Sequence, residues 1–307
     1  MIELPVSRRP QGLAHVPMKE LLTPKQVGRA IDVSESSVKR WCDRGEIATQ
    51  YTAGGHRRIA LATVLDLVRQ GKYTLVNPAA LGLPASSGQT ERAVDRARQR
   101  FTDALVAGDE MTCRQLVLDL YLANHSLAVI CDEVLAAAFV AIGDRWSCGE
   151  VEVYRERRGC EIASHVVHEL RDLLPSIPDS APLAMGGTAT GDHYELATSM
   201  AEVVLRDCGW HAVCLGENLP FSTLDAALAE NRPQLFWLSC SYIPDIDAFL
   251  EGYNKLYAAY HQRTAFVVGG NALDAEVRRK MNYAAHCDNM QHLATFAQTL
   301  RDARECS

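Results

Sequence analysis

Residues 19–72 carry short apolar patterns that predict two helices. Thr23 is a favourable N-cap and Pro24 suits the first helical position, so a helix is predicted to begin there. A second helix is predicted after Ser34, with Val38 and Trp41 on its buried face and polar or basic residues on the other. The apolar residues of the first helix recur at helical spacing: Val27, Ala30 and Ile31.

A basic hairpin is predicted to follow the second helix. Residues 47–51 and 57–59 are strand-like on either side of the sequence AGGH, whose paired glycines suit a tight turn. Two helices joined by a short turn and followed by such a hairpin predict a winged helix-turn-helix, whose second helix enters the major groove of DNA. A small helical docking domain with a solvated basic face is the alternative. The residues predicted to contact DNA are Ser36, Lys39, Arg40, His56, Arg57 and Arg58.

The pattern becomes continuously helical after a predicted linker. Residues 73–90 are rich in Pro, Ala, Gly and Ser, as flexible linkers are. In residues 91–175 apolar positions recur every three or four residues, with breaks near 108–109, 125–126 and 149. This spacing predicts a bundle of four helices with short links. A bundle alone says little about function, because its apolar stripes form a core by default.

Residues 181–303 contain four short apolar runs: PLAMGG, HAVCLG, QLFWLSCS and TAFVVGG. Short buried strands that alternate with helical segments predict a parallel, doubly wound sheet of the Rossmann-like kind. The loops after such strands line the ligand crevice. The predicted fold class is therefore multidomain, α and α/β, with a winged helix-turn-helix head, a four-helix bundle and a parallel sheet.

Composition and charge narrow the function. The chain has 307 residues, 48% hydrophobic and 22% charged, as expected of a globular protein with two or three domains. No apolar run reaches the roughly 18 to 20 residues of a membrane span, and the N-terminal MIELPVSRRP lacks an apolar signal core, so a cytoplasmic protein without membrane contact is predicted. Ten cysteines without a CxxC pair indicate reduced thiols and no metal site.

Charge divides the chain into two parts of opposite sign. Residues 1–70 hold 11 Lys/Arg against 7 Asp/Glu, whereas the remainder holds 20 against 31. A basic head on an acidic body favours a polyanion as the partner of the head alone. The head resembles the DNA-binding domain of the MerR superfamily, a likeness carried by LTPKQVGRAIDVSESSVKRW and the wing GGHRRI. The resemblance implies a double-stranded DNA operator, and paired half-sites imply a homodimer or a higher homo-oligomer.

The bundle and the sheet together resemble the cobalamin-binding photoreceptor regulators of the CarH/LitR type. That family has a Trp and a Glu-His pair separated by nine residues on the bundle, and here Trp146 and Glu156 match while Arg157 replaces the His. In its sheet domain the family pattern Asp-x-His-x-x-Gly corresponds to Asp192, Tyr194 and Ala197 within GDHYELA, so Tyr194 replaces the axial His and His193 is one residue early. The later family positions fall on Ser239, Ser241, Gly269 and Gly270.

The two missing histidines leave the ligand open. The resemblance implies a tetrapyrrole capped by Trp146 and Glu156, either cobalamin held without histidine ligation or a bilin such as biliverdin. A bilin carries propionates that a guanidinium at Arg157 would bind. Haem ligated by Tyr194 is a smaller alternative. Cys160, one turn after Glu156, and Cys148 could anchor a bilin, although most such thiols are inert small hydrophobes.

The leading function is a transcription regulator whose oligomerisation or DNA affinity is controlled by this tetrapyrrole, with light as a candidate signal. One alternative is a regulator without a ligand, whose vestigial pocket answers to a protein partner. A second is a structural organiser of DNA. The sequence offers no convincing nucleophile–base pair and no segment long enough for a substrate-activating barrel, so a cobalamin-dependent enzyme or its accessory domain is not expected.

Overall fold

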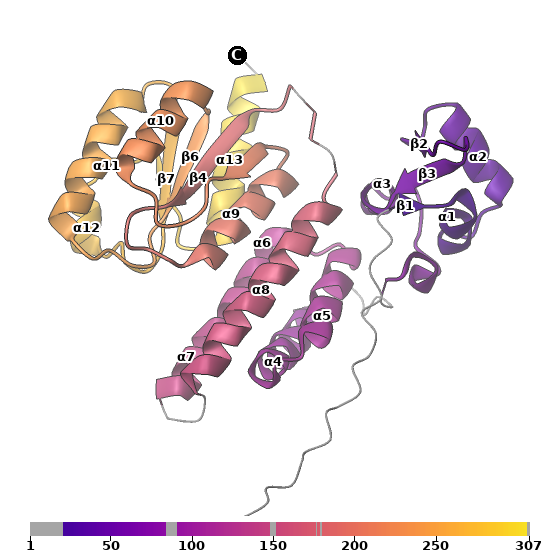
Figure 1. The fold of residues 1–307 in the computed structure, drawn as a ribbon, viewed down its shortest axis with the longest axis horizontal. Coiled ribbons are helices and arrows are strands. Elements are labelled where there is room, and N and C mark those ends of the chain that lie inside the picture. Colours follow the sequence, from indigo (N-terminus) through magenta and orange to yellow (C-terminus); the bar gives the residue numbers. More distant parts are fainter. Residues whose placement is uncertain (1–20, 84–90, 148–151, 176, 179, 306–307) are drawn as a thin grey trace, which may run out of the picture. The chain divides into compact units, whose positions relative to one another are not determined.

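The computed structural model describes residues 21–83, 91–147, 152–175, 177–178 and 180–305, except for the side chains of residues 91, 146, 147, 304 and 305. The chain divides into two compact units, Met1–Ala85 and Ser86–Ser307 (Figure 1). The first unit contains the predicted head, and the second contains both the bundle and the sheet.

The first unit is a helix-turn-helix with a small antiparallel sheet. Both predicted N-caps are confirmed, because Thr23 Oγ1 accepts from Gln26 N at 3.2 Å and Ser34 Oγ accepts from Ser37 N at 3.1 Å. In its sheet β3 lies between β1 and β2. The elements are β1 (Leu21–Leu22), α1 (Pro24–Ala30), α2 (Glu35–Asp43), β2 (Gln50–Tyr51), β3 (Arg57–Ala60), α3 (Leu61–Arg69) and a 3₁₀ turn η1 (Pro78–Leu81).

A tight turn fixes the angle between α1 and α2. Asp32 adopts a positive φ of 54°, a conformation that Asp tolerates better than most residues. A Cβ at Gly28 would approach the carbonyl oxygen of Val33 to 2.6 Å, so only glycine lets the chain return this closely. The turn therefore determines how α2 projects from the first unit.

The first unit extends further along the chain than the sequence predicts. A linker is predicted from residue 73, but Tyr73 stacks on Trp41 with ring centroids 4.9 Å apart. Val76 N also donates to Ala30 O at 2.8 Å, and both Leu81 and Leu83 are buried. The linker-like composition hides these two leucines, whose burial is enough to order the segment on the end of α1. Of the predicted linker, residues 84–90 lie outside the described residues.

The bundle has the four predicted rods, one of them interrupted. Asp109 caps α5 by accepting from Thr112 N at 3.1 Å and Ser126 caps α6 by accepting from Val129 N at 3.3 Å, which confirms two of the predicted breaks. The third break, at residue 149, lies outside the described residues. The third rod contains a π-helical segment, which shifts the faces of the residues after it. The elements are α4 (Glu91–Ala107), α5 (Glu110–Leu122), α6 (Leu127–Ile130), the π segment η2 (Cys131–Ala136), α7 (Ala137–Ser147) and α8 (Val153–Leu173).

The sheet of the second unit is parallel and five-stranded, in the order β5-β4-β6-β7-β8. All four predicted apolar runs form strands, whereas β8 has only two residues and gives no apolar run in the sequence. The strand order reverses between β4 and β6, which makes their carboxyl ends the expected ligand crevice. The strands are β4 (Leu183–Thr188), β5 (His211–Cys214), β6 (Leu235–Ser239), β7 (Ala265–Gly269) and β8 (Ala285–His286).

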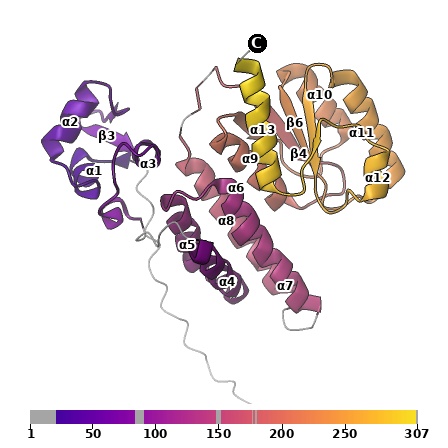
Figure 2. The ribbon, with the colours of Figure 1, turned by 180° about the vertical axis from the view of Figure 1, so that it is seen from behind.

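Helices cover both faces of this sheet (Figures 1 and 2). One face carries α10 (Phe221–Asn231), α11 (Ile246–Tyr260) and α12 (Ala275–Arg279), whose apolar residues form one buried cluster with β6 and β7. The other face carries α9 (Glu195–Asp207) and α13 (Met290–Glu305), and the bundle packs on these two helices through α6, η2 and α8.

Polar contacts join the bundle to the sheet domain. The carboxylate of Asp132 in η2 accepts from Met290 N at 2.8 Å and from Gln291 N at 2.9 Å, at the first residues of α13. Arg171 Nη1 of α8 lies 3.8 Å from Glu202 Oε2 of α9. These contacts place the π segment of the bundle directly against the sheet domain. Within the described residues, no helix combines the length and the apolar character needed to cross a membrane.

Candidate DNA-binding surface and ligand pocket

The outer face of α2 presents the polar residues that the sequence predicts. Ser36, Lys39 and Arg40 are all exposed. Their partners are local, since Lys39 Nζ lies 2.7 Å from Glu35 Oε1 and Arg40 Nη2 donates to Ser37 Oγ at 3.2 Å. Exposed ion pairs of this kind contribute little free energy, so a DNA phosphate can replace them at low cost.

The wing uses its two arginines differently. Arg57 donates from Nε and Nη2 to Asp43 Oδ1 at 3.1 and 2.6 Å, and this hydrogen bonding raises the pKa of its guanidinium. Arg57 therefore ties the wing to the end of α2. Arg58 is half-buried and its Nη1 donates to the carbonyl of its neighbour at 3.0 Å, whereas His56 is exposed at the turn. Of the three predicted wing residues, His56 is therefore the most exposed.

Asp192 joins the two loops at the switch point of the sheet. It is 1% exposed, and its Oδ2 accepts from Ser241 N at 2.6 Å and Tyr242 N at 3.2 Å, in the loop after β6. Its Oδ1 accepts from Tyr194 N at 3.1 Å, at the start of α9. Three backbone amides thus use the carboxylate, which leaves it buried and satisfied.

The two residues after Asp192 point away from the protein interior. The His193 side chain is 64% exposed, and its Nδ1 lies 3.6 Å from Glu217 Oε1. Tyr194 is the N-cap residue of α9 and is 48% exposed, without a side-chain capping bond. The loop therefore presents a phenol at the sheet edge and keeps its imidazole on the surface beside Glu217.

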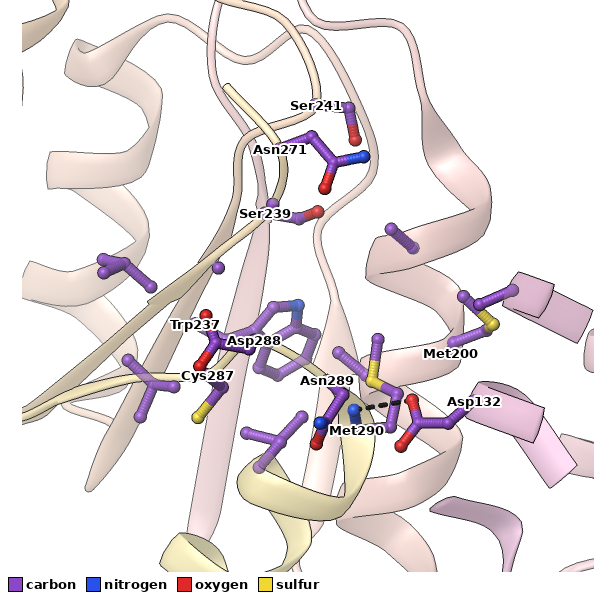
Figure 3. Close-up of a pocket in the computed structure, with 18 of the residues that line it drawn as sticks. Asp132, Met200, Trp237, Ser239, Ser241, Asn271, Cys287, Asp288, Asn289 and Met290 are labelled. Atoms are coloured by element: carbon purple, nitrogen blue, oxygen red, sulfur yellow. Dashed lines mark hydrogen bonds between the residues drawn. The ribbon is translucent and has the colours of Figure 1, made fainter. Parts of the chain in front are cut away.

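A groove of about 370 Å³ runs beside this edge, between the sheet domain and the bundle (Figure 3). Ser239, Ser241, Gly269 and Gly270 line it, so the structure brings together the four residues that the sequence predicts from the loops after β6 and β7. The groove begins near Ser241 and Asn271 at the carboxyl ends of these strands.

The two glycines also serve the backbone. A Cβ at Gly269 would lie 2.7 Å from Cys287 O, and Gly270 has a φ of 111° and would crowd the backbone of Cys240. The glycines are therefore required where β7 approaches its neighbours, independently of any ligand.

The bundle supplies one wall of the groove. Asp132 and Ala136 of η2 and Ala137 and Val140 of α7 line it opposite α9 and α13. Val140 is 66% exposed although its side chain is apolar. Because both halves of the second unit contribute residues, any occupant of the groove contacts both.

Comparison with known proteins agrees with this architecture. Residues 21–72 match a helix-turn-helix domain family, and residues 97–171 match a family described as a B12 binding domain. The HTH-type transcriptional repressor CarA of Myxococcus xanthus is 24% identical over 224 residues, which are 70% of this chain and 75% of CarA. The repressor CarH of the same organism is 29% identical over 162 residues, 51% of this chain and 52% of CarH.

The chain is therefore similar to CarA and CarH. It combines a DNA-binding head with a B12-binding domain, and it is a transcription regulator rather than an enzyme. It spans about half the length of CarH itself. A monomethylamine corrinoid protein of Methanosarcina barkeri shares the fold of the second unit, with a TM-score of 0.56 at 16% identity over 69% of this chain and all of that one.

The predicted cap residues whose side chains the structure describes lie apart from the groove. Glu156, Arg157 and Cys160, on the first turns of α8, do not line the groove, and the side chain of Trp146 and all of Cys148 lie outside the described residues. Arg155 and Arg158 donate to the carbonyls of Val106 and Gly108 at 3.0 and 3.1 Å, whereas Arg157 is exposed and makes no hydrogen bond or ion pair with the described residues. Burial raises the pKa of the Cys160 thiol.

Two residues that line the groove, Trp237 and Asp132, are not among the site residues that the sequence predicts. Trp237 of β6 is 3% exposed, and its indole lies inside the groove. The sequence feature that could have indicated Trp237 is a large aromatic residue in one strand together with the paired glycines of PLAMGG in another. The ring needs such a glycine, because a Cβ at Gly186 would collide with it. Asp132 gave no signal, because its role depends on a π segment and on a helix 158 residues later.

Proposed function

We propose that this protein represses or activates transcription under the control of a tetrapyrrole held between the bundle and the sheet domain. The observation that carries the proposal is the groove of about 370 Å³, which lies at the carboxyl ends of β6 and β7 and has walls from both halves. Parallel sheets bind ligands at this edge. We also propose that the protein acts in the cytoplasm, which a DNA-binding head supports.

Exposed apolar side chains on both sides of this edge support a large, flat ligand. Tyr194, Tyr242 and Ile246 follow strands β4 and β6 and are 48%, 53% and 45% exposed. Val140, which lines the groove from the bundle, is 66% exposed. Exposed large hydrophobic side chains beside a groove favour a binding surface. A conjugated macrocycle or an open-chain bilin offers the matching apolar faces.

The residues at the expected cobalt-ligand position do not fit histidine ligation. Asp192 accepts from three backbone amides, and within the described residues none of its side-chain hydrogen bonds is to an imidazole. His193 is exposed beside Glu217, and Tyr194 occupies the position of the family His. We therefore propose that the ligand is held by its faces and its side groups, either as cobalamin without histidine ligation or as a bilin, with haem as the smaller alternative.

Contacts between the bundle and the sheet domain connect this groove to the rest of the chain. Asp132 holds α13, and Arg171 lies near Glu202 of α9, so a change at the groove alters how the bundle packs. We propose that this packing controls self-association, which decides how many heads engage an operator at once. A regulator without a ligand, controlled by a protein partner through the same exposed surface, is the competing function.

The test is the absorption spectrum of the full chain after expression with cobalamin, biliverdin or haem supplied. Retained pigment, together with a change in operator binding on gel shift between the loaded and the pigment-free protein, is the expected result. Repeating the gel shift in the dark and after illumination decides whether light is the signal. Failure to retain any of the three pigments, with operator binding intact, would overturn the ligand part and favour the protein partner.

A further inference from the structure

We infer that the groove accepts a flat tetrapyrrole ring and rejects the phosphate-bearing nucleotide arm of cobalamin. This inference rests on the proposed function and selects among its ligands. Cobalamin carries a phosphodiester and a benzimidazole base on a long arm, whereas bilins and haem carry no such arm. Two features of the groove, Trp237 and Asp132, oppose the arm.

Trp237 forms a buried aromatic wall of the groove, so a base inserted there would meet its ring. Its indole packs directly against Gly186 of the neighbouring strand, and its Nε1 donates to Thr198 Oγ1 of α9 at 2.9 Å, both buried. These contacts anchor the ring between the sheet and α9. Moving it would leave the indole N–H and the Thr198 hydroxyl without their bond in a buried site. The ring therefore remains as an aromatic wall against which a conjugated ligand can stack.

Asp132 occupies the place where a phosphate would find donors. The N-terminus of the 16-residue helix α13 opens onto the groove, and such helix ends attract anions through their free amides. Here the Asp132 carboxylate accepts from Met290 N, Gln291 N and Gln291 Nε2 at 2.8, 2.9 and 3.2 Å (Figure 3). The Asp132 carboxylate therefore already occupies the place at the start of α13 where a phosphate would bind.

The remaining charge of the groove also repels a phosphate. Asp132 and Asp288 both line it, and no Lys or Arg is present among the described lining residues. A phosphodiester placed there would face two carboxylates without a compensating cation. The rest of the wall is mainly apolar, from residues such as Met200, Val267 and Leu293. A neutral ring gains contact area in this groove, whereas a nucleotide arm loses hydration without replacement.

The test compares two corrins that differ in the arm. Cyanocobalamin and dicyanocobinamide are titrated into the full chain and followed by absorbance, with biliverdin as a third probe. Wild type is expected to bind the arm-less cobinamide about tenfold more tightly than cobalamin or better. Asp132→Asn removes the charge without changing the shape, and Trp237→Ala opens the space. Each is expected to narrow that ratio by at least about threefold through a gain in cobalamin affinity.

Matched controls separate the groove from general stability. Asp207 accepts from Leu127 N at 3.4 Å at another contact between bundle and sheet domain and does not line the groove, so Asp207→Asn should leave the ratio unchanged. Trp237→Phe retains an aromatic wall and should move the ratio less than Trp237→Ala. Circular dichroism and operator gel shift check that each variant folds, and Asp132→Asn carries the test if Trp237→Ala does not.

The outcomes separate this inference from the proposed function. Equal wild-type affinities for the two corrins, or variants that leave the ratio unchanged, overturn the inference while tetrapyrrole binding stands. Binding of biliverdin alone, with both corrins excluded from wild type and variants, also overturns it, because the arm would then not be the cause. A wild type without pigment whose variants gain cobalamin supports the inference and refutes the proposed function. Absence of binding throughout overturns both.

Discussion

The outer face of α2 and the carboxyl edge of the sheet use polar residues in opposite ways. On α2, the partners of Lys39 and Arg40 within the described residues are local and exposed, so both side chains remain available to another molecule. At the sheet edge, Asp192 is buried and accepts from three backbone amides, while the exposed residues are Tyr194 and Tyr242. The difference matches two kinds of partner, a polyanion read by open charges and a flat ligand held by apolar faces.

Asp192→Ala removes the buried carboxylate at the sheet edge, and among these variants we expect it to have the largest effect. It removes the acceptor of three partly buried backbone N–H groups, and we expect a loss of roughly 3 kcal/mol in the free energy of unfolding of the second unit. Urea unfolding followed by tryptophan fluorescence measures it. Asp245→Ala is the matched control, because that exposed N-cap accepts only from Ala248 N, and its loss costs about 1 kcal/mol. Equal losses for the two variants would show that Asp192 is only a local cap.

The double variant Arg40→Ala/Arg58→Ala tests the predicted DNA-binding surface of the first unit. We expect operator binding to weaken by roughly tenfold for each arginine and the salt dependence of binding to become shallower, since both guanidinium groups face solvent or the chain's own backbone. A gel shift at several salt concentrations, on a duplex selected from a random pool, measures both. Arg279→Ala removes an exposed arginine of the second unit and should change neither. An unchanged salt dependence in the double variant would contradict phosphate contact.

The parts that sequence predicted are those fixed by nearby residues. Thr23 and Ser34 cap helices through amides three residues away, and the apolar runs of the sheet become strands because burial depends on their own composition. The role of Asp192 depends on amides 49 and 50 residues later, and that of Trp237 depends on a glycine of another strand. Such long-range partners follow from the topology of the fold, which a local residue pattern does not encode. The sequence therefore predicts which loop residues line the groove but does not predict their hydrogen-bond partners.

Arg157→Ala would sharpen the comparison, because Arg157 is exposed and makes no hydrogen bond or ion pair with the described residues. If it pairs with a propionate, its loss should weaken biliverdin binding by roughly fivefold and leave cobalamin binding unchanged, as expected of one exposed ion pair. Absorbance titration measures both ligands. Arg158→Ala is the control, because that arginine already donates to Gly108 O at 3.1 Å. Equal losses for biliverdin and cobalamin in Arg157→Ala would refute the propionate contact.

Alkylation of Cys287 tests how accessible the groove is to reagents in solution, and it has the smallest expected effect of these experiments. It lines the groove, and burial raises the pKa of its thiol to about 11. A raised pKa keeps the thiol protonated below that value, so at pH 8 only about one molecule in a thousand carries the nucleophilic thiolate. We therefore expect Cys287 to stay unmodified by iodoacetamide at pH 8 and any bilin to be released on denaturation. Mass spectrometry of tryptic peptides measures the adduct, with alkylation in urea as the positive control. Rapid modification of the folded chain at pH 8, or pigment that remains attached in denaturant, would mean that the groove activates its thiol, and the sheet edge would then hold its ligand by a covalent bond as well as by apolar contact.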